Sequence, residues 1–215
     1  MKELLLVFDK DGVIVDSEGV KLASIEAVFG NDFPMHAEAI HTYNHESIGI
    51  PRKIKFEYIC REILKLPNVE QVTQHYSELY TKRVNEELKQ IPLIAGIREY
   101  LTHRPERKFV CSAAPHPEVV QNIHDHNLGS FFEELYAFPS PKAEVMLNLK
   151  ARFDAEIVFW GDTMADYKAA TEANVHFIGL TTATVNPFTH LDIPTIPDFS
   201  DKERIDRIID ERSEK

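Results

Sequence analysis

The sequence contains little cysteine and no long hydrophobic segment. Cys60 and Cys111 are the only cysteines in 215 residues, and they form no CxxC pair or other zinc-like spacing. This excludes a disulfide framework and favours a reducing compartment. The apolar run Leu4–Phe8 is too short for a membrane span or for the core of a signal peptide. We therefore expect a cytoplasmic protein.

Positive charge is also scarce. Lys and Arg number 24 against 35 Asp and Glu, so the formal net charge is -11 at pH 7. A nucleic acid or an anionic membrane would favour a clustered basic face, so we expect neither as the main partner. A small anionic substrate remains compatible with this charge if an acidic site binds a divalent cation.

Four short apolar runs predict strands that are covered on both faces, because none of them alternates between apolar and polar residues. They are Leu4–Phe8, Lys108–Cys111, Glu156–Trp160 and Val175–Leu180. Helical patterns lie between them, at about 95–102, 117–127, 143–153 and 164–173. This alternation predicts an α/β fold with a Rossmann-like, doubly wound parallel sheet.

The segment 16–91 interrupts the alternation. Apolar residues recur at helical spacing from Ile54 to Ile63, Val69–Leu88 is a long helical candidate, and no convincing strand is present. We therefore expect a helical domain inserted after the first strand, with residues 1–15 and 92–215 forming the core domain.

A pair of carboxylates follows the first predicted strand. Asp9 and Asp11 flank one residue, and Gly12 comes next. Two carboxylates this close cost free energy unless a cation or a shared proton accompanies them. Ordinary turn chemistry is the alternative interpretation. A calcium loop is not, because Val20 stands where its last ligand, a glutamate, would be.

A second carboxylate pair follows the third predicted strand. Asp162 and Asp166 are one helical turn apart, so both can face the same point, although Asp162 or Thr163 could simply cap the helix. Ser112 follows another strand, and Lys142 stands at the head of a helix. Ligands of open parallel sheets bind outside the carboxyl ends of the strands, which places these residues at one predicted site.

Together these residues resemble the four motifs of the haloacid dehalogenase superfamily, in the family's order and over nearly the whole chain. The first motif, Phe8–Glu18, reads Phe-Asp-Lys-Asp-Gly-Val-Ile-Val-Asp-Ser-Glu and is similar to the beta-phosphoglucomutase and phosphoglycolate phosphatase branch. The resemblance implies a Mg²⁺-dependent phosphatase that hydrolyses a small-molecule phosphate monoester through an aspartyl phosphate. The expected oligomeric state is a monomer or a weak homodimer.

The resemblance also implies a role for each motif residue. Asp9 would be the nucleophile and Asp11 the general acid and base. Ser112 would hold the phosphoryl oxygens, Lys142 would neutralise charge, and Gly12 and Ala113 would line the substrate. The Mg²⁺ ligands would be Asp9, the backbone carbonyl of Asp11 and Asp162, with Asp166 as a further ligand or directly behind them.

Two positions depart from the family pattern. The third motif usually has proline after its lysine, whereas here Pro141 precedes Lys142. Ala113 and Ala114 follow Ser112, which keeps the small-residue loop but offers fewer hydroxyl groups.

The insertion resembles the helical cap of the same family, which supplies substrate specificity. Arg52, Lys53 and Lys55 form a local basic cluster in the sequence, and we expect Arg52 and Lys53 to bind a second anionic group of the substrate. A solvated helix face is the commoner interpretation of such residues. His41 and His45 have i, i+4 spacing, but no third ligand accompanies them in the sequence, so no zinc site is expected.

Other functions compete with a phosphatase. A sugar-phosphate mutase uses the same core and motifs, so the sequence leaves it open. A catalytically silent binding protein is also possible, although the motif residues are all present. Dehalogenase and phosphonatase chemistry is disfavoured, because those branches typically lack a carboxylate at the position of Asp11.

Overall fold

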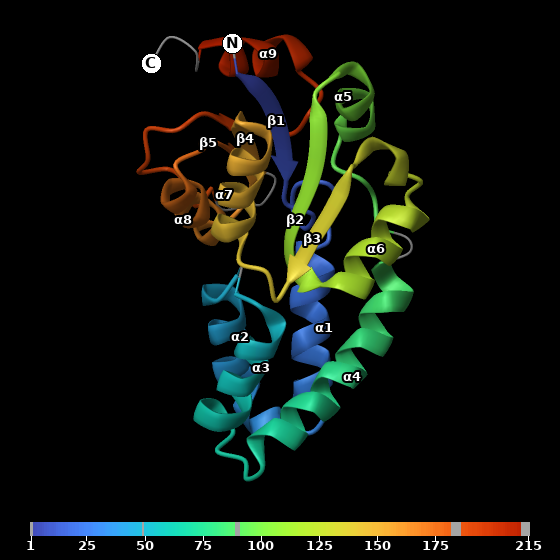
Figure 1. The fold of residues 1–215 in the computed structure, drawn as a ribbon. Helices are drawn as coiled ribbons and strands as arrows, with labels where there is room; N and C mark the ends of the chain where they lie inside the picture. Colours follow the sequence, from blue (N-terminus) through green and yellow to red (C-terminus); the bar gives the residue numbers. More distant parts are fainter. Residues whose placement is uncertain (1, 49, 89–90, 182–185, 212–215) are drawn as a thin grey trace. The chain divides into compact units, whose positions relative to one another are not determined.

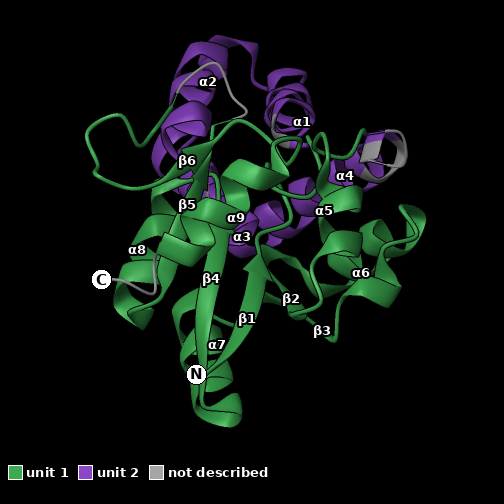
Figure 2. Cartoon of the chain, turned by 90° about the horizontal axis from the view of Figure 1, so that it is seen from above, with its two compact units in different colours: residues 1–16, 92–215 green, residues 17–91 purple. Residues whose placement is uncertain are grey.

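The computed structural model describes residues 2–48, 50–88, 91–181 and 186–211. The chain divides into two compact units, coloured separately in Figure 2. Unit 1 comprises residues 1–16 and 92–215, and unit 2 comprises residues 17–91. No helix among the described residues is both long and apolar enough to cross a membrane.

Among its described residues, unit 1 contains a six-stranded parallel sheet of order β3-β2-β1-β4-β5-β6 (Figure 1). The chain passes from β1 through β2 to β3 and then returns to β4 on the other side of β1. This confirms the doubly wound α/β fold. The strands are β1 (Glu3–Phe8), β2 (Arg107–Pro115), β3 (Glu134–Phe138), β4 (Ala155–Gly161), β5 (His176–Leu180) and β6 (Thr195–Ile196).

Helices and loops cover both faces of this sheet. On one face, Leu5 and Val7 of β1 pack in a buried cluster with residues of α7 and α8. On the other face, Phe8 stacks on Trp160 and meets Tyr100 of α5 edge to face. Both sides of β1 are buried, which explains its uninterrupted apolar run. The helices are α5 (Ile97–His103), α6 (His116–Asp125), α7 (Lys142–Phe153), α8 (Met164–Ala173) and α9 (Lys202–Glu211), with a short 3₁₀ turn, η3 (Gly129–Phe131).

The sheet has two strands beyond the four predicted. The first, β3, is an edge strand in which only Ala137 is buried, and the second, β6, has two residues. Sequence analysis missed β3 although Leu135–Phe138 is a short apolar run, whereas β6 is too short to leave a recognisable pattern. The second predicted strand was also too short, since β2 extends beyond Cys111 to Pro115.

Unit 2 is built from helices, and none of its described residues belongs to a strand of the sheet. Its core is aromatic: the Phe29 ring stacks on Tyr76 with centroids 4.3 Å apart and meets Phe56 edge to face at 5.1 Å. The elements are α1 (Glu18–Gly30), a 3₁₀ turn η1 (Pro34–His36), α2 (Ala37–Glu46), α3 (Arg52–Tyr58), a π-helical turn η2 (Ile59–Ile63) and α4 (Val69–Leu88).

Candidate active site

The two aspartate motifs leave the sheet side by side. Phe8 at the end of β1 pairs with Trp160 of β4, and the Asp9 N–H donates to the Trp160 carbonyl at 2.9 Å. The direction of winding reverses between β1 and β4, and open α/β sheets bind ligands outside the strand ends at such a reversal. Asp9 and Asp162 therefore stand where the topology favours a ligand.

Glycine permits the contact between these motifs. The turn after β1 closes through N–H groups of Ile14 and Val15, which both donate to the Lys10 carbonyl. Gly12 has φ of +75° in this turn, a conformation that L residues rarely adopt. A Cβ atom at Gly12 would lie 1.9 Å from Oδ2 of Asp162. The turn can therefore approach the Asp162 carboxylate only with glycine at this position.

Three carboxylates converge at these strand ends. Asp9, Asp162 and Asp166 each offer an oxygen atom, and these atoms lie within 4.8 Å of one another. Asp166 is buried and also caps α8: its Oδ2 accepts from the hydroxyl of Thr163 at 2.5 Å and from its N–H at 3.2 Å. Capping and membership of the carboxylate cluster thus occur in the same residue. Oxygen ligands of this type suit a hard cation such as Mg²⁺.

Lys142, the first residue of α7, bridges two of these carboxylates. Its Nζ lies 3.0 Å from Oδ1 of Asp9 and 2.5 Å from Oδ1 of Asp166. Burial by itself would lower the pKa of Lys142, but Asp166 and Asp9 outweigh burial and raise it, so the side chain stays an ammonium. One ammonium cannot balance three carboxylates, so the cluster favours a further cation.

Asp9 is difficult to ionise without such a cation. Its pKa is raised to about 7, because burial and the nearby Asp166 and Asp11 carboxylates together outweigh the opposing effect of Lys142. A buried carboxylate surrounded by like charges takes up a proton unless positive charge compensates it. Asp9 is thus a group whose charge depends on what binds beside it.

Sequence analysis missed Lys10, the residue between Asp9 and Asp11. This lysine is fully buried, and its Nζ lies 3.1 Å from Oδ1 of Asp11 and 3.4 Å from Oε1 of Glu118 in α6. Its N–H donates to Oδ1 of Asp9 at 2.8 Å. Lys10 therefore restrains both motif aspartates. No local signal reveals this, because Glu118 is distant in sequence and lysine is usually exposed.

Ser112 lies inside β2 rather than after it, which corrects the prediction. It stands two residues beyond Val110, which pairs with Phe8, and in the stretch where the β2–β3 register shifts. Its side chain is buried, and Oγ accepts the Ala114 N–H at 3.1 Å. Ala113 lies in the same irregular stretch.

Burial raises the pKa of the adjacent Cys111 thiol to about 12, so that thiol stays protonated.

A protein-family comparison identifies the family. The model described as haloacid dehalogenase-like hydrolase matches residues 6–180, most of the chain. The chain belongs to the haloacid dehalogenase-like hydrolases. The matched segment contains all six motif residues of this hydrolase: Asp9, Asp11, Ser112, Lys142, Asp162 and Asp166.

Several solved structures have the same fold. A predicted phosphoglycolate phosphatase from Haemophilus somnus matches with a TM-score of 0.74 and 19% identity, covering 96% of this chain and 99% of that one. A predicted phosphatase from Clostridium acetobutylicum has a TM-score of 0.73 and 17% identity, covering 98% and 100%. A candidate beta-phosphoglucomutase from Thermotoga maritima has a TM-score of 0.67 and 15% identity, covering 96% and 99%. No curated protein matches this hydrolase.

The predicted basic cluster of unit 2 is not a single group of side chains. It consists of Arg52, Lys53 and Lys55. Arg52 donates from Nη1 to Oγ1 of Thr81 at 3.1 Å, and its guanidinium lies over the Tyr80 ring. Lys55 is buried, whereas the Lys53 side chain is 63% exposed. Helical geometry turns Lys53 away from Arg52 and Lys55, because successive residues of a helix point in directions about 100° apart. Of the three, Lys53 is the most exposed to solvent in this hydrolase.

Proposed function

We propose that the chain is a Mg²⁺-dependent phosphatase that hydrolyses a small-molecule phosphate monoester through an aspartyl phosphate on Asp9. The observation that carries the proposal is the position of Asp9, which is buried, contacts Lys142 and shares a carboxylate cluster with Asp162 and Asp166. Family membership supports hydrolysis, and two of the similar structures are described as phosphatases.

In the first step, a carboxylate oxygen of Asp9 attacks phosphorus and the bond from phosphorus to the ester oxygen breaks. Asp11 protonates the leaving alkoxide, which general acid catalysis accelerates by about 10²–10⁴-fold. Lys142 offsets negative charge on Asp9 and on the transferred group, since its ammonium already contacts Oδ1 of Asp9. Ser112 would donate to a phosphoryl oxygen, and Gly12 and Ala113 would line the same site.

In the second step, Asp11 removes a proton from water as the water oxygen attacks the aspartyl phosphate. The bond between phosphorus and Asp9 breaks, which releases inorganic phosphate and regenerates the Asp9 carboxylate. Lys10 contributes by position, because its backbone N–H contacts Asp9 and its ammonium contacts Asp11.

The acidic cluster fits Mg²⁺, with ligands from Asp9, the backbone carbonyl of Asp11 and Asp162, and with Asp166 as a further ligand or support. The bound cation would supply positive charge. This charge would let the carboxylates stay ionised side by side and would offset the negative charge of the phosphoryl oxygens. Asp166 already accepts bonds from Thr163 and contacts Lys142, so it is the residue better suited to support.

Unit 2 is proposed as the cap domain, close to the predicted boundaries of 16–91, with the remaining residues as the catalytic core. A mutase is the second candidate, because one similar structure is described as a candidate beta-phosphoglucomutase. A mutase would return the phosphoryl group to the product, so isomerised sugar phosphate would accumulate faster than inorganic phosphate.

A panel of small phosphate monoesters tests the proposal, with inorganic phosphate and isomerised products measured separately. We expect phosphate release that needs Mg²⁺, stops with a chelator and is absent in Asp9→Asn. Equal release by Asp9→Asn, or full activity in excess chelator, would contradict the mechanism. An inactive panel with normal Mg²⁺ binding would instead favour a silent binding protein.

A further inference from the structure

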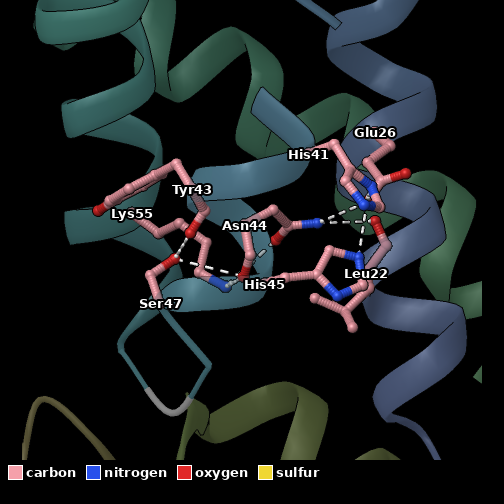
Figure 3. A network of polar contacts seen from close by, with 8 residues as sticks. All are labelled: Leu22, Glu26, His41, Tyr43, Asn44, His45, Ser47 and Lys55. Atoms are coloured by element: carbon pink, nitrogen blue, oxygen red, sulfur yellow. Dashed lines mark hydrogen bonds and ion pairs between the residues drawn. The ribbon is translucent and has the colours of Figure 1, made fainter. Parts of the chain in front are cut away.

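Unit 2 contains a second group of metal-ligating side chains, drawn in Figure 3, that the catalytic proposal does not use. Glu26 of α1 lies beside His41 and His45 of α2. Nδ1 of His41 lies 3.0 Å and Nε2 of His45 lies 3.2 Å from the same oxygen, Oε1 of Glu26. Glu26 is therefore a candidate third ligand that the sequence spacing alone did not reveal.

The spacing of these atoms is compatible with one bound metal ion. One ligand atom from each of Glu26, His41 and His45 lies within 4.8 Å of the others. Tetrahedral zinc holds nitrogen and oxygen ligands at about 2.0–2.2 Å, which places neighbouring ligand atoms about 3.3–3.5 Å apart. The two nitrogen–oxygen distances, 3.0 and 3.2 Å, are only slightly shorter, so small side-chain rotations would admit an ion.

A buried hydrogen-bond network holds the carboxylate in place. Asn44 is fully buried, and its Nδ2 donates to Oε1 of Glu26 at 3.3 Å and to the Leu22 carbonyl at 3.1 Å. Nζ of the buried Lys55 lies 3.2 Å from Oδ1 of Asn44, which fixes the amide with its NH₂ group toward Glu26. Metal-ligating carboxylates are typically oriented by such hydrogen bonds.

The ligand types and their exposure identify the class of ion. Two imidazoles and one carboxylate suit zinc, whereas Mg²⁺ and Ca²⁺ prefer oxygen ligands throughout. The side chains of His41 and His45 are 58% and 44% exposed, so an ion can enter from solvent and water can complete its coordination.

We propose that Glu26, His41 and His45 form a zinc site that joins α1 to α2. The ion would replace the two contacts between the imidazoles and Oε1 of Glu26 with stronger bonds, since it neutralises the carboxylate and uses both nitrogen lone pairs. The site would stabilise unit 2 against unfolding. It is independent of the phosphatase proposal, because none of its ligands belongs to the catalytic cluster.

A zinc titration of the untagged 215-residue chain in excess Mg²⁺ tests this site, with a competing chromogenic chelator as the readout. The Mg²⁺ keeps the carboxylate cluster of unit 1 from contributing. We expect one zinc equivalent for the native chain, and its loss in His41→Ala and His45→Ala. Glu26→Gln keeps the shape but loses the charge, so its zinc affinity should fall at least about tenfold. His75→Ala, an exposed histidine on α4, is the matched control and should bind zinc normally.

Cobalt provides a second readout that does not depend on the variants. Co²⁺ bound by two imidazoles and a carboxylate should give visible absorption bands in the native chain, and zinc should abolish them. Circular dichroism checks that each variant is folded. If Glu26→Gln, His41→Ala and the native chain bind zinc with equal affinity and stoichiometry, the contacts are only a hydrogen-bonded histidine pair and the proposal is wrong.

Discussion

Gly12 and Asp162 approach so closely that no methyl group fits between them: a Cβ at Gly12 would lie 1.9 Å from Oδ2 of Asp162. The turn that follows β1 thus packs directly against the carboxylate that follows β4. The positive φ of Gly12 imposes a second restriction on the same position.

The first prediction concerns this contact. Gly12→Ala should displace Asp162, lower Mg²⁺ affinity and activity by about 10–100-fold, and destabilise the fold by about 1–3 kcal/mol. The matched control is Gly19→Ala, because no atom lies within 4 Å of the Cβ position at that exposed glycine of α1. Metal titration, phosphate release and chemical unfolding measure the effects. If the two variants had similar Mg²⁺ affinity, activity and stability, the contact between Gly12 and Asp162 would not matter for function.

The second prediction separates the two aspartates of the first motif. Asp9→Asn removes the attacking oxygen, so turnover should vanish for every substrate. Asp11→Asn should reduce the rate with an alkyl phosphate by about 10²–10⁴-fold and much less with an aryl phosphate, whose leaving group needs less protonation. Steady-state rates with the two substrates test this. Equal losses with both would exclude Asp11 as the general acid.

The third prediction follows from the raised pKa of Asp9 in the metal-free protein. The ordinary pKa is 3.8 and the folded value is about 7, so between these values the folded state binds a proton that the unfolded state has released. Stability should therefore fall as pH rises from about 4 to about 7, by at most about 4 kcal/mol, since one pKa unit corresponds to about 1.4 kcal/mol.

Urea unfolding in excess chelator across this pH range measures that dependence. Asp9→Asn has no titrating carboxyl group at position 9, so its stability should lose this part of the dependence on pH. Adding Mg²⁺ above pH 7 should restore stability to the native chain more than to Asp9→Asn. Superimposable pH profiles for the two proteins would mean that Asp9 ionises normally.

The fourth prediction concerns substrate recognition by unit 2. If Lys53 binds a second anionic group, Lys53→Ala should raise the KM of the true substrate by about tenfold and leave that of an aryl phosphate unchanged. Lys65→Ala is a matched control, because both lysines are exposed and each pairs with a glutamate close in sequence, Lys53 with Glu57 and Lys65 with Glu62. Arg52→Ala is less suitable, since Arg52 also packs on Tyr80. Equal effects on both substrates would assign Lys53 to the surface.

Local sequence patterns were sufficient for much of the fold. The uninterrupted apolar run of β1 indicated a strand buried on both faces, and the helical periodicity of Val69–Leu88 matches α4 residue for residue. The carboxyl ends of parallel strands lie at one edge of a sheet, so the predicted parallel sheet placed Asp9 and Asp162 at the same edge. These inferences succeeded because the buried positions of a strand or helix carry apolar residues, and this pattern is visible in the element's own sequence.

Contacts between distant elements were beyond the sequence. The ion pair of Lys10 with Glu118 and the position of Glu26 beside two histidines both arise where one helix packs against another element. A residue's own neighbours in sequence carry no record of such a partner. The sequence therefore determined the buried strands and the order of the motif residues, and only the tertiary structure decided which charged side chains meet, because their partners depend on how whole elements pack.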